Sequence, residues 1–146
     1  MEQWELVARE RIRDTLAAYA HAGDRGRVAA LADTFTRDGV LEVKGREPAV
    51  GRTAIIAVLS EAIAQGAALR SRGRPRYTRH LVTGLCFEEL TPVAARTSAY
   101  FLVLTEHGAD HWGRYRDELT PVGDRWLFTR RLVRVDPAEG VPQPAG

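Results

Sequence analysis

Four strand-like segments in the second half of the chain decide the fold: YTRHLVTGLCFEE at 77–89, VAARTSAYFLVLT at 93–105, HWGRYRDELT at 111–120 and RWLFTRRLVRV at 125–135. They are rich in β-branched and aromatic residues, as strands are. Turn residues separate them, at Thr91-Pro92, His107-Gly108 and Val122-Gly123-Asp124. Consecutive strands with short connections form antiparallel pairs, so these segments predict a meander.

The first half of the chain has the spacing of helices. An apolar stripe predicts a first helix over about residues 2–22, with Gly23 ending it; the stripe is Ala8, Ile12, Leu16 and Tyr19. A second helix would follow Asp24, with an inward face of Val28, Leu31, Ala32 and Phe35. A third helix is predicted from Thr53 to Ala64, after a short strand at Val40–Val43 and a loop at 44–51.

These elements predict one α+β domain over residues 1–136, in which three N-terminal helices close a curved antiparallel sheet around a central pocket. Residues 65–75 are rich in glycine and arginine and are expected to form a mobile loop. The tail at 137–146 holds three prolines and little to bury, so we expect it to be flexible.

Composition restricts the function classes. The chain has 146 residues, a net charge of +2 and a single cysteine, Cys86, which is expected to be a buried free thiol. Without a signal peptide or a long apolar run, the expected compartment is the cytoplasm, with no membrane partner. The arginines at 70–79 predict a solvated loop and no nucleic-acid partner, because no recognition module accompanies them. No metal or phosphate-binding motif is present, so no metal or cofactor is expected.

His80 is the most informative candidate for chemistry. A histidine on an apolar strand face is more often a satisfied core residue than a catalyst, but one that titrates near neutrality can move protons. Its strand face would also hold Val82, Gly84 and Cys86. Asp24 has two readings, as a helix cap or as a carboxylate that orients a histidine. Spacing alone leaves both open.

Several aromatic and polar side chains are candidates for lining the pocket or simply for filling the core, namely Tyr19, Tyr100, Tyr115 and Trp112. His111, Gly113, Tyr115 and Asp117 share one face of their strand. That face is unusually polar for one devoted to packing, so it could either line the pocket or be the solvent-exposed face of the sheet.

The order of these features resembles SnoaL-like and scytalone-dehydratase-like proteins of the nuclear transport factor 2 superfamily. The resemblance covers residues 3–135 and is carried by Tyr19-Ala-His-Ala-Gly-Asp24, Leu31, Phe35, Asp38, Gly51, Arg79-His80, Gly113-Arg-Tyr115, Asp117, Trp126 and Arg130-Arg131. It implies a cone of curved sheet with a deep pocket. It also implies that Asp24 and His80 form a catalytic pair, since scytalone dehydratase has an aspartate and a histidine at those positions. Gly23 stands where that enzyme has a tyrosine, which argues against scytalone itself as substrate.

The resemblance implies an acid–base enzyme without cofactor, a dehydratase, cyclase or isomerase of polyketide-, steroid- or terpenoid-like molecules. His80 and Asp24 would be catalytic, and the substrate would contact Tyr19, His111, Tyr115, Trp112 and Tyr100. The alternative is a non-catalytic binding or interaction module of the same fold, such as a dioxygenase small-subunit-like protein. The family also implies a homodimer formed through the outer face of the sheet.

Overall fold

The structure, a computed structural model, describes residues 1–70 and 75–137, the side chains of 66–70 excepted. Three helices are present: α1 (Gln3–Asp24), α2 (Val28–Ala32) and α3 (Arg52–Arg70). The strands are β1 (Phe35–Val43), β2 (Ala49–Val50), β3 (Arg79–Leu90), β4 (Ala95–Thr105), β5 (Gly108–Val122) and β6 (Arg125–Val135). The predicted α+β class and the predicted meander are confirmed.

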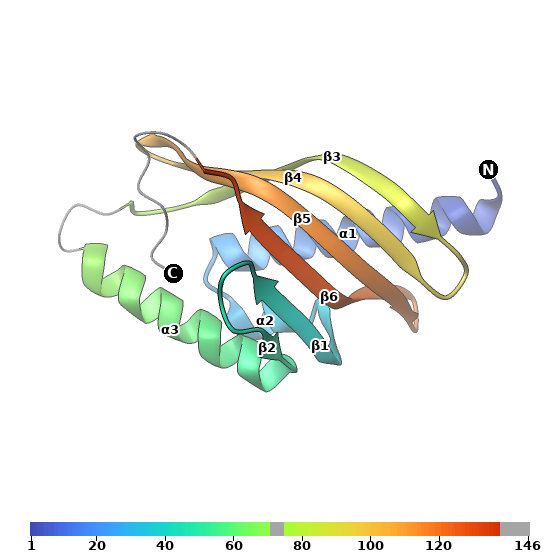
Figure 1. The fold of residues 1–146 in the computed structure, drawn as a ribbon, viewed down its shortest axis with the longest axis horizontal. Helices are drawn as coiled ribbons and strands as arrows, with labels where there is room; N and C mark the ends of the chain where they lie inside the picture. Colours follow the sequence, from blue (N-terminus) through green and yellow to red (C-terminus); the bar gives the residue numbers. More distant parts are fainter. Residues whose placement is uncertain (71–74, 138–146) are drawn as a thin grey trace.

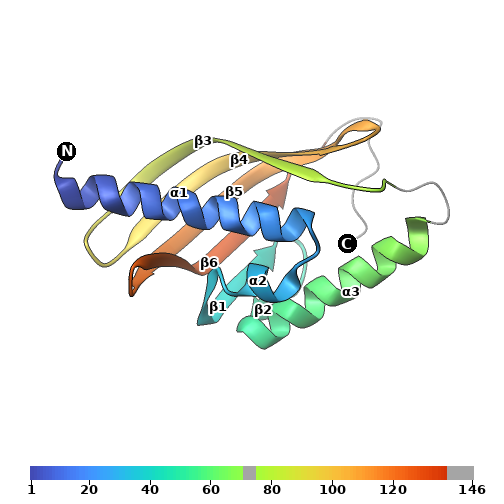
Figure 2. The ribbon, with the colours of Figure 1, turned by 180° about the vertical axis from the view of Figure 1, so that it is seen from behind.

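One curved sheet holds the six strands in the order β2-β1-β6-β5-β4-β3. Strands β3 to β6 pair antiparallel in sequence order, while β1 joins the edge of β6 in parallel. Helix α1 runs along one face of the sheet, with α2 and α3 beside the end formed by β1 and β2 (Figures 1 and 2). The sheet therefore has an inner face toward the helices and an outer face away from them.

The helix boundaries differ from the prediction at three points. Gly23 does not end the first helix, because α1 continues through Asp24. Asp24 does not cap the second helix, since the residue preceding α2 is Arg27. Helix α3 runs past Ala64 to Arg70, so much of the predicted loop at 65–75 is helical. Residues 71–74 of that loop, and the tail beyond Pro137, lie outside the described residues.

Phe35, predicted on the second helix, instead opens β1. Its ring is fully buried and contacts Tyr19 and Phe128, with ring centres 6.2 and 5.2 Å away. The backbone reason is that Phe128 donates its N–H to the carbonyl of Thr34 at 2.9 Å, which starts the pairing with β6. The strand predicted at Val40–Val43 is therefore longer, and the loop after it contains the short strand β2.

A bulge in β3 changes which residues face inward. Gly84 has φ +64° and the pairing with β4 shifts between Thr83 and Cys86. Before the bulge His80 and Val82 face inward, and after it Leu85 and Phe87 do. Cys86 therefore lies on the outer face and is exposed, so the expectation of a buried thiol is wrong.

Between α1 and the sheet lies a packed aromatic centre. Its rings meet at centroid distances of 4.6–6.2 Å and belong to Tyr19, Phe35, Phe101, Tyr115 and Phe128. Burial of such rings supplies much of a core's stability. In the part of the chain that the structure describes, no helix combines the length and the apolar character needed to cross a membrane.

Candidate functional site

Asp24 and His80 meet at the end of α1. The Asp24 carboxylate oxygen Oδ1 lies 2.5 Å from Nδ1 of His80, and both carboxylate oxygens lie 3.1 Å from the His80 backbone nitrogen. Both side chains are largely buried, with 23% of His80 and 13% of Asp24 exposed. The carboxylate thus accepts hydrogen bonds from the backbone and the ring of one residue, which fixes the ring's orientation.

This contact assigns the roles of the ring nitrogens. An ionised carboxylate can only accept hydrogen bonds, so Nδ1 must carry a proton. Nε2 is then the basic nitrogen of the neutral ring. Among the described residues, Nε2 has no hydrogen-bond partner. The pair therefore has the arrangement needed to take up a proton at Nε2 while Asp24 stabilises the resulting imidazolium.

Two hollows adjoin His80. The α1–β3 hollow, of about 440 Å³, has an apolar part of its lining that includes Leu16, Val82 and Leu85. The polar part includes Arg13, His21, Asp24 and Arg79. The helix hollow, of about 250 Å³, lies among α1, α2 and α3 and is lined chiefly by apolar residues, including Leu31, Leu59 and Ile63. Asp24 lines only the first of these, whereas His80 lines both. His80 is thus shared by the linings of the two hollows.

Tyr19 is the one predicted substrate contact that shares a hollow with His80. It lines the helix hollow and is otherwise enclosed by the aromatic centre. Burial raises the pKa of its hydroxyl above the ordinary value of tyrosine. The hydroxyl consequently stays protonated at neutral pH, and the side chain of Arg131 lies beside it.

Tyr115 and His111 occupy the inner face of β5. Tyr115 is only 2% exposed and stacks on Phe101 at 4.6 Å, so it fills the core. His111 is partly exposed, with Nδ1 2.7 Å from Asp110. It lies in the same cross-strand row as His80, with Val103 between them. Two strand spacings, roughly 10 Å, separate the backbones.

Tyr100 and Trp112 do not belong to the site. Tyr100 is 57% exposed and lies on the outer face of β4, against Gly84. Trp112 alternates with His111 and Gly113, which places it on the outer face of β5. The structure therefore does not bring either side chain together with His80.

A buried ion pair went unrecognised in the sequence. The guanidinium of Arg131 donates two hydrogen bonds of 2.8 Å to Asp117, and both side chains are fully buried. The guanidinium also lies 3.7 Å from the ring centre of Tyr115 and 4.2 Å from that of Tyr19. Burial opposes the charge, but the Asp117 carboxylate outweighs it and the pKa of Arg131 is raised.

The turn at Gly123-Asp124 offered a partial signal for that pair. Its register pairs Leu119 with Phe128, and extending it unchanged would place Asp117 opposite Arg130. A bulge between Glu118 and Leu119 shifts the partner to Arg131. The bulge thus decides that Arg131, and not Arg130, pairs with Asp117, and the sequence gives no sign of this bulge.

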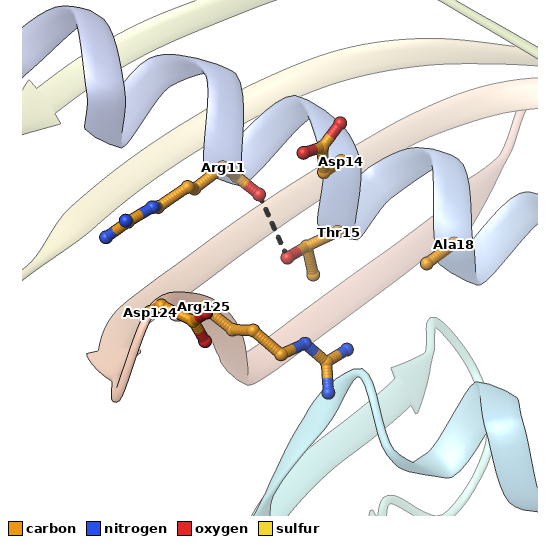
Figure 3. A pocket seen from close by; sticks show the side chains of 6 residues that line it. All are labelled: Arg11, Asp14, Thr15, Ala18, Asp124 and Arg125. Atoms are coloured by element: carbon orange, nitrogen blue, oxygen red, sulfur yellow. Dashed lines mark hydrogen bonds between the residues drawn. The ribbon is translucent and has the colours of Figure 1, made fainter.

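A third hollow lies on the opposite side of α1 from β3 (Figure 3). It holds about 350 Å³ between that helix and the β5–β6 turn, and its lining includes Arg11, Asp14, Asp124 and Arg125. Its floor is closed by Thr15, whose hydroxyl donates to a backbone carbonyl, that of Trp126 or of Arg11. It does not include His80, so the acid–base pair is served by the other two hollows.

The protein is thus a small α+β domain with two hollows beside His80, whose ring the Asp24 carboxylate orients. The chain belongs to the family of SnoaL-like domains, which matches residues 4–132. That family includes isomerases, dehydratases and cyclases. No relative among curated proteins matches the chain.

Solved structures share this fold along most of the chain. A Catenulispora acidiphila protein, in complex with S-DNPA, is 32% identical with a TM-score of 0.71, covering 86% of this chain and 91% of its own. A Mycobacterium tuberculosis protein of unknown function is 25% identical with a TM-score of 0.76, covering 92% and 75%. A protein suggested to be a scytalone dehydratase, from Novosphingobium aromaticivorans, is 23% identical with a TM-score of 0.78, covering 93% and 89%. At that identity it shows the fold alone.

Proposed function

We propose that the protein is an acid–base enzyme, a dehydratase, cyclase or isomerase, that acts on a small, largely apolar molecule of polyketide, steroid or terpenoid type. The observation that carries the proposal is the 2.5 Å contact between the Asp24 carboxylate and Nδ1 of His80 beside an apolar hollow. The Asp24 and His80 side chains are sufficient for the proposed proton transfer.

In the proposed reaction His80 acts as the base. Nε2 removes a proton from a carbon next to a carbonyl, and the imidazolium returns it to a departing hydroxyl or to another carbon. Asp24 keeps Nδ1 protonated and stabilises the charge that develops on the ring. Such proton transfers contribute typically 10²–10⁴-fold to a rate.

Tyr19 is the proposed contact for the substrate oxygen. It lines the same hollow as His80, and its neutral hydroxyl can donate to a carbonyl whose negative charge grows during proton removal. The walls that α2 and α3 supply are largely apolar, and a hydrogen bond is stronger in apolar surroundings than in water. His111, partly exposed on the inner face, is a second candidate for substrate contact.

The proposal is tested with 5-nitrobenzisoxazole, an apolar aromatic molecule that opens to a coloured phenolate when a base removes one carbon-bound proton. We expect saturable turnover, lost in His80→Gln and reduced about 10²-fold in Asp24→Asn. Asparagine keeps an oxygen for the His80 backbone N–H but lacks the charge. His107→Gln is the matched control, because His107 is exposed in a turn.

A non-catalytic binding role is the second candidate. The structure of the Catenulispora acidiphila protein in complex with S-DNPA favours it, since that relative holds a small molecule. This role predicts that 5-nitrobenzisoxazole binds without turnover, and that His80→Gln leaves both its affinity and its background opening unchanged. Turnover that survives in His80→Gln would also contradict the acid–base proposal.

A further inference from the structure

We propose that the outer face of the sheet carries a binding site for a small, multiply charged oxyanion, such as a phosphate ester or pyrophosphate group. The site, which we call the basic groove, is a hollow of about 320 Å³ over β1, β5 and β6, on the side of the sheet away from His80. It is lined by Glu42, Lys44, Arg114, Arg116, Leu132 and Arg134. This site is independent of the proposed acid–base function. It lies toward the β1 edge of the outer face, so β3 and β4 at the other edge are left for the homodimer contact expected on that face.

The register of the sheet forces like charges together in the basic groove. Arg114 lies directly opposite Arg134 in the β5–β6 pair, and Arg116 lies opposite Leu132, one row further along. Lys44 joins from the β1 side, where its backbone N–H donates to the carbonyl of Val133 at 2.9 Å. Like charges directly opposite each other destabilise a sheet unless something neutralises them.

No carboxylate within the described ranges forms an ion pair with the cations of the basic groove. The one acidic side chain in the lining, Glu42, is already engaged in an ion pair with Arg130, which lies outside the basic groove. Across residues 1–70 and 75–137, none of Lys44, Arg114, Arg116 or Arg134 forms an ion pair. Elsewhere on the same face Arg96 does form an ion pair, with Glu89 at 2.8 Å.

The chemistry of the four cations selects a phosphate-like ligand. Guanidinium groups present paired N–H donors that match two oxygens of a phosphate, and three of the four cations are arginines. With one carboxylate against four cations, the basic groove favours more than one negative charge on the ligand. The lining thus carries an excess of positive charge, although the net charge of the whole chain is only +2.

Titration calorimetry with inorganic pyrophosphate tests the site, at about 0.05 M salt, below the range in which surface charges are strongly screened. We expect saturable binding with one site per chain, and an affinity about tenfold lower in Arg134→Gln and in Arg114→Gln. Arg96→Gln, which removes the same charge from the same face, is the matched control and should bind like the wild type.

Thermal unfolding gives a second readout that separates loss of the site from loss of the fold. Pyrophosphate should raise the Tm of the wild type and of Arg96→Gln, because a ligand that binds the folded state stabilises it. Without pyrophosphate, the Tm of Arg134→Gln should be no lower than that of the wild type, since the substitution relieves repulsion.

Three results would overturn the proposal. The first is the absence of saturable binding. The second is equal weakening by Arg96→Gln and Arg134→Gln, which would show attraction by overall charge. The third is binding of a single-stranded DNA oligomer when pyrophosphate does not bind, which would make the basic groove part of an extended nucleic-acid surface.

Discussion

Asp24 illustrates how far a single residue can be interpreted from sequence. Its position after an apolar stripe fits a cap as well as an orienting carboxylate, because both roles need an acceptor near a helix end. The structure selects the second, with the carboxylate holding both the backbone and the ring of His80. The contact joins residues 56 positions apart, so local spacing could not reveal it.

The contribution of the buried Asp117–Arg131 pair to stability can be tested by removing one partner. Arg131→Met should lower the free energy of unfolding by about 3–5 kcal/mol, because it leaves the Asp117 carboxylate buried without a partner. Urea unfolding measures the loss. The double variant Asp117→Leu/Arg131→Met should recover most of it, since no charge is then left in the core. A loss below about 1 kcal/mol in the single variant would instead be typical of an exposed pair.

Among the elements, β3 shows why strand alternation alone is insufficient. Counting by twos from His80 places Cys86 on the inner face, and the bulge at Gly84 reverses this. The bulge between Glu118 and Leu119 likewise decides which arginine meets Asp117. The helices and the meander could be predicted from apolar periodicity and turn residues. The bulges could not be predicted, because they depend on how neighbouring strands fit together.

Gly84→Ala tests the role of that bulge. Alanine is strained at φ +64°, and its Cβ would lie 2.8 Å from the ring of Tyr100. We expect the free energy of unfolding to fall by about 1–2 kcal/mol, measured by urea unfolding. The same substitution in a Tyr100→Ala background should cost less, because the ring contact is gone while the backbone strain stays. An unchanged stability in Gly84→Ala would mean that β3 pairs without this bulge.

For the molecule as a whole, the packed aromatic centre sets the response to alkaline pH. Burial raises the pKa of both Tyr19 and Tyr115 above the ordinary value of about 10. Above pH 10 the unfolded chain releases these protons while the folded chain keeps them, so the free energy of unfolding falls as pH rises. Each tyrosine contributes up to about 1.4 kcal/mol per pH unit.

Urea unfolding between about pH 9 and pH 11 measures this slope. Tyr115→Phe should reduce the slope, because phenylalanine has no proton to release. The exposed Tyr100 supplies the control, since Tyr100→Phe should leave the slope as it is in the wild type. Equal slopes in the wild type and in Tyr115→Phe would show that the Tyr115 hydroxyl is not protected by the fold.

The proposed function depends above all on Asp24 holding His80 with Nδ1 protonated and Nε2 as the free base. Nitrogen NMR of the histidine rings at a pH where His80 is neutral tests it most directly. We expect the proton on Nδ1 in the wild type, and loss of that tautomer preference in Asp24→Asn. A neutral His80 with its proton on Nε2 would contradict this arrangement, because Nε2 could then accept no proton from a substrate.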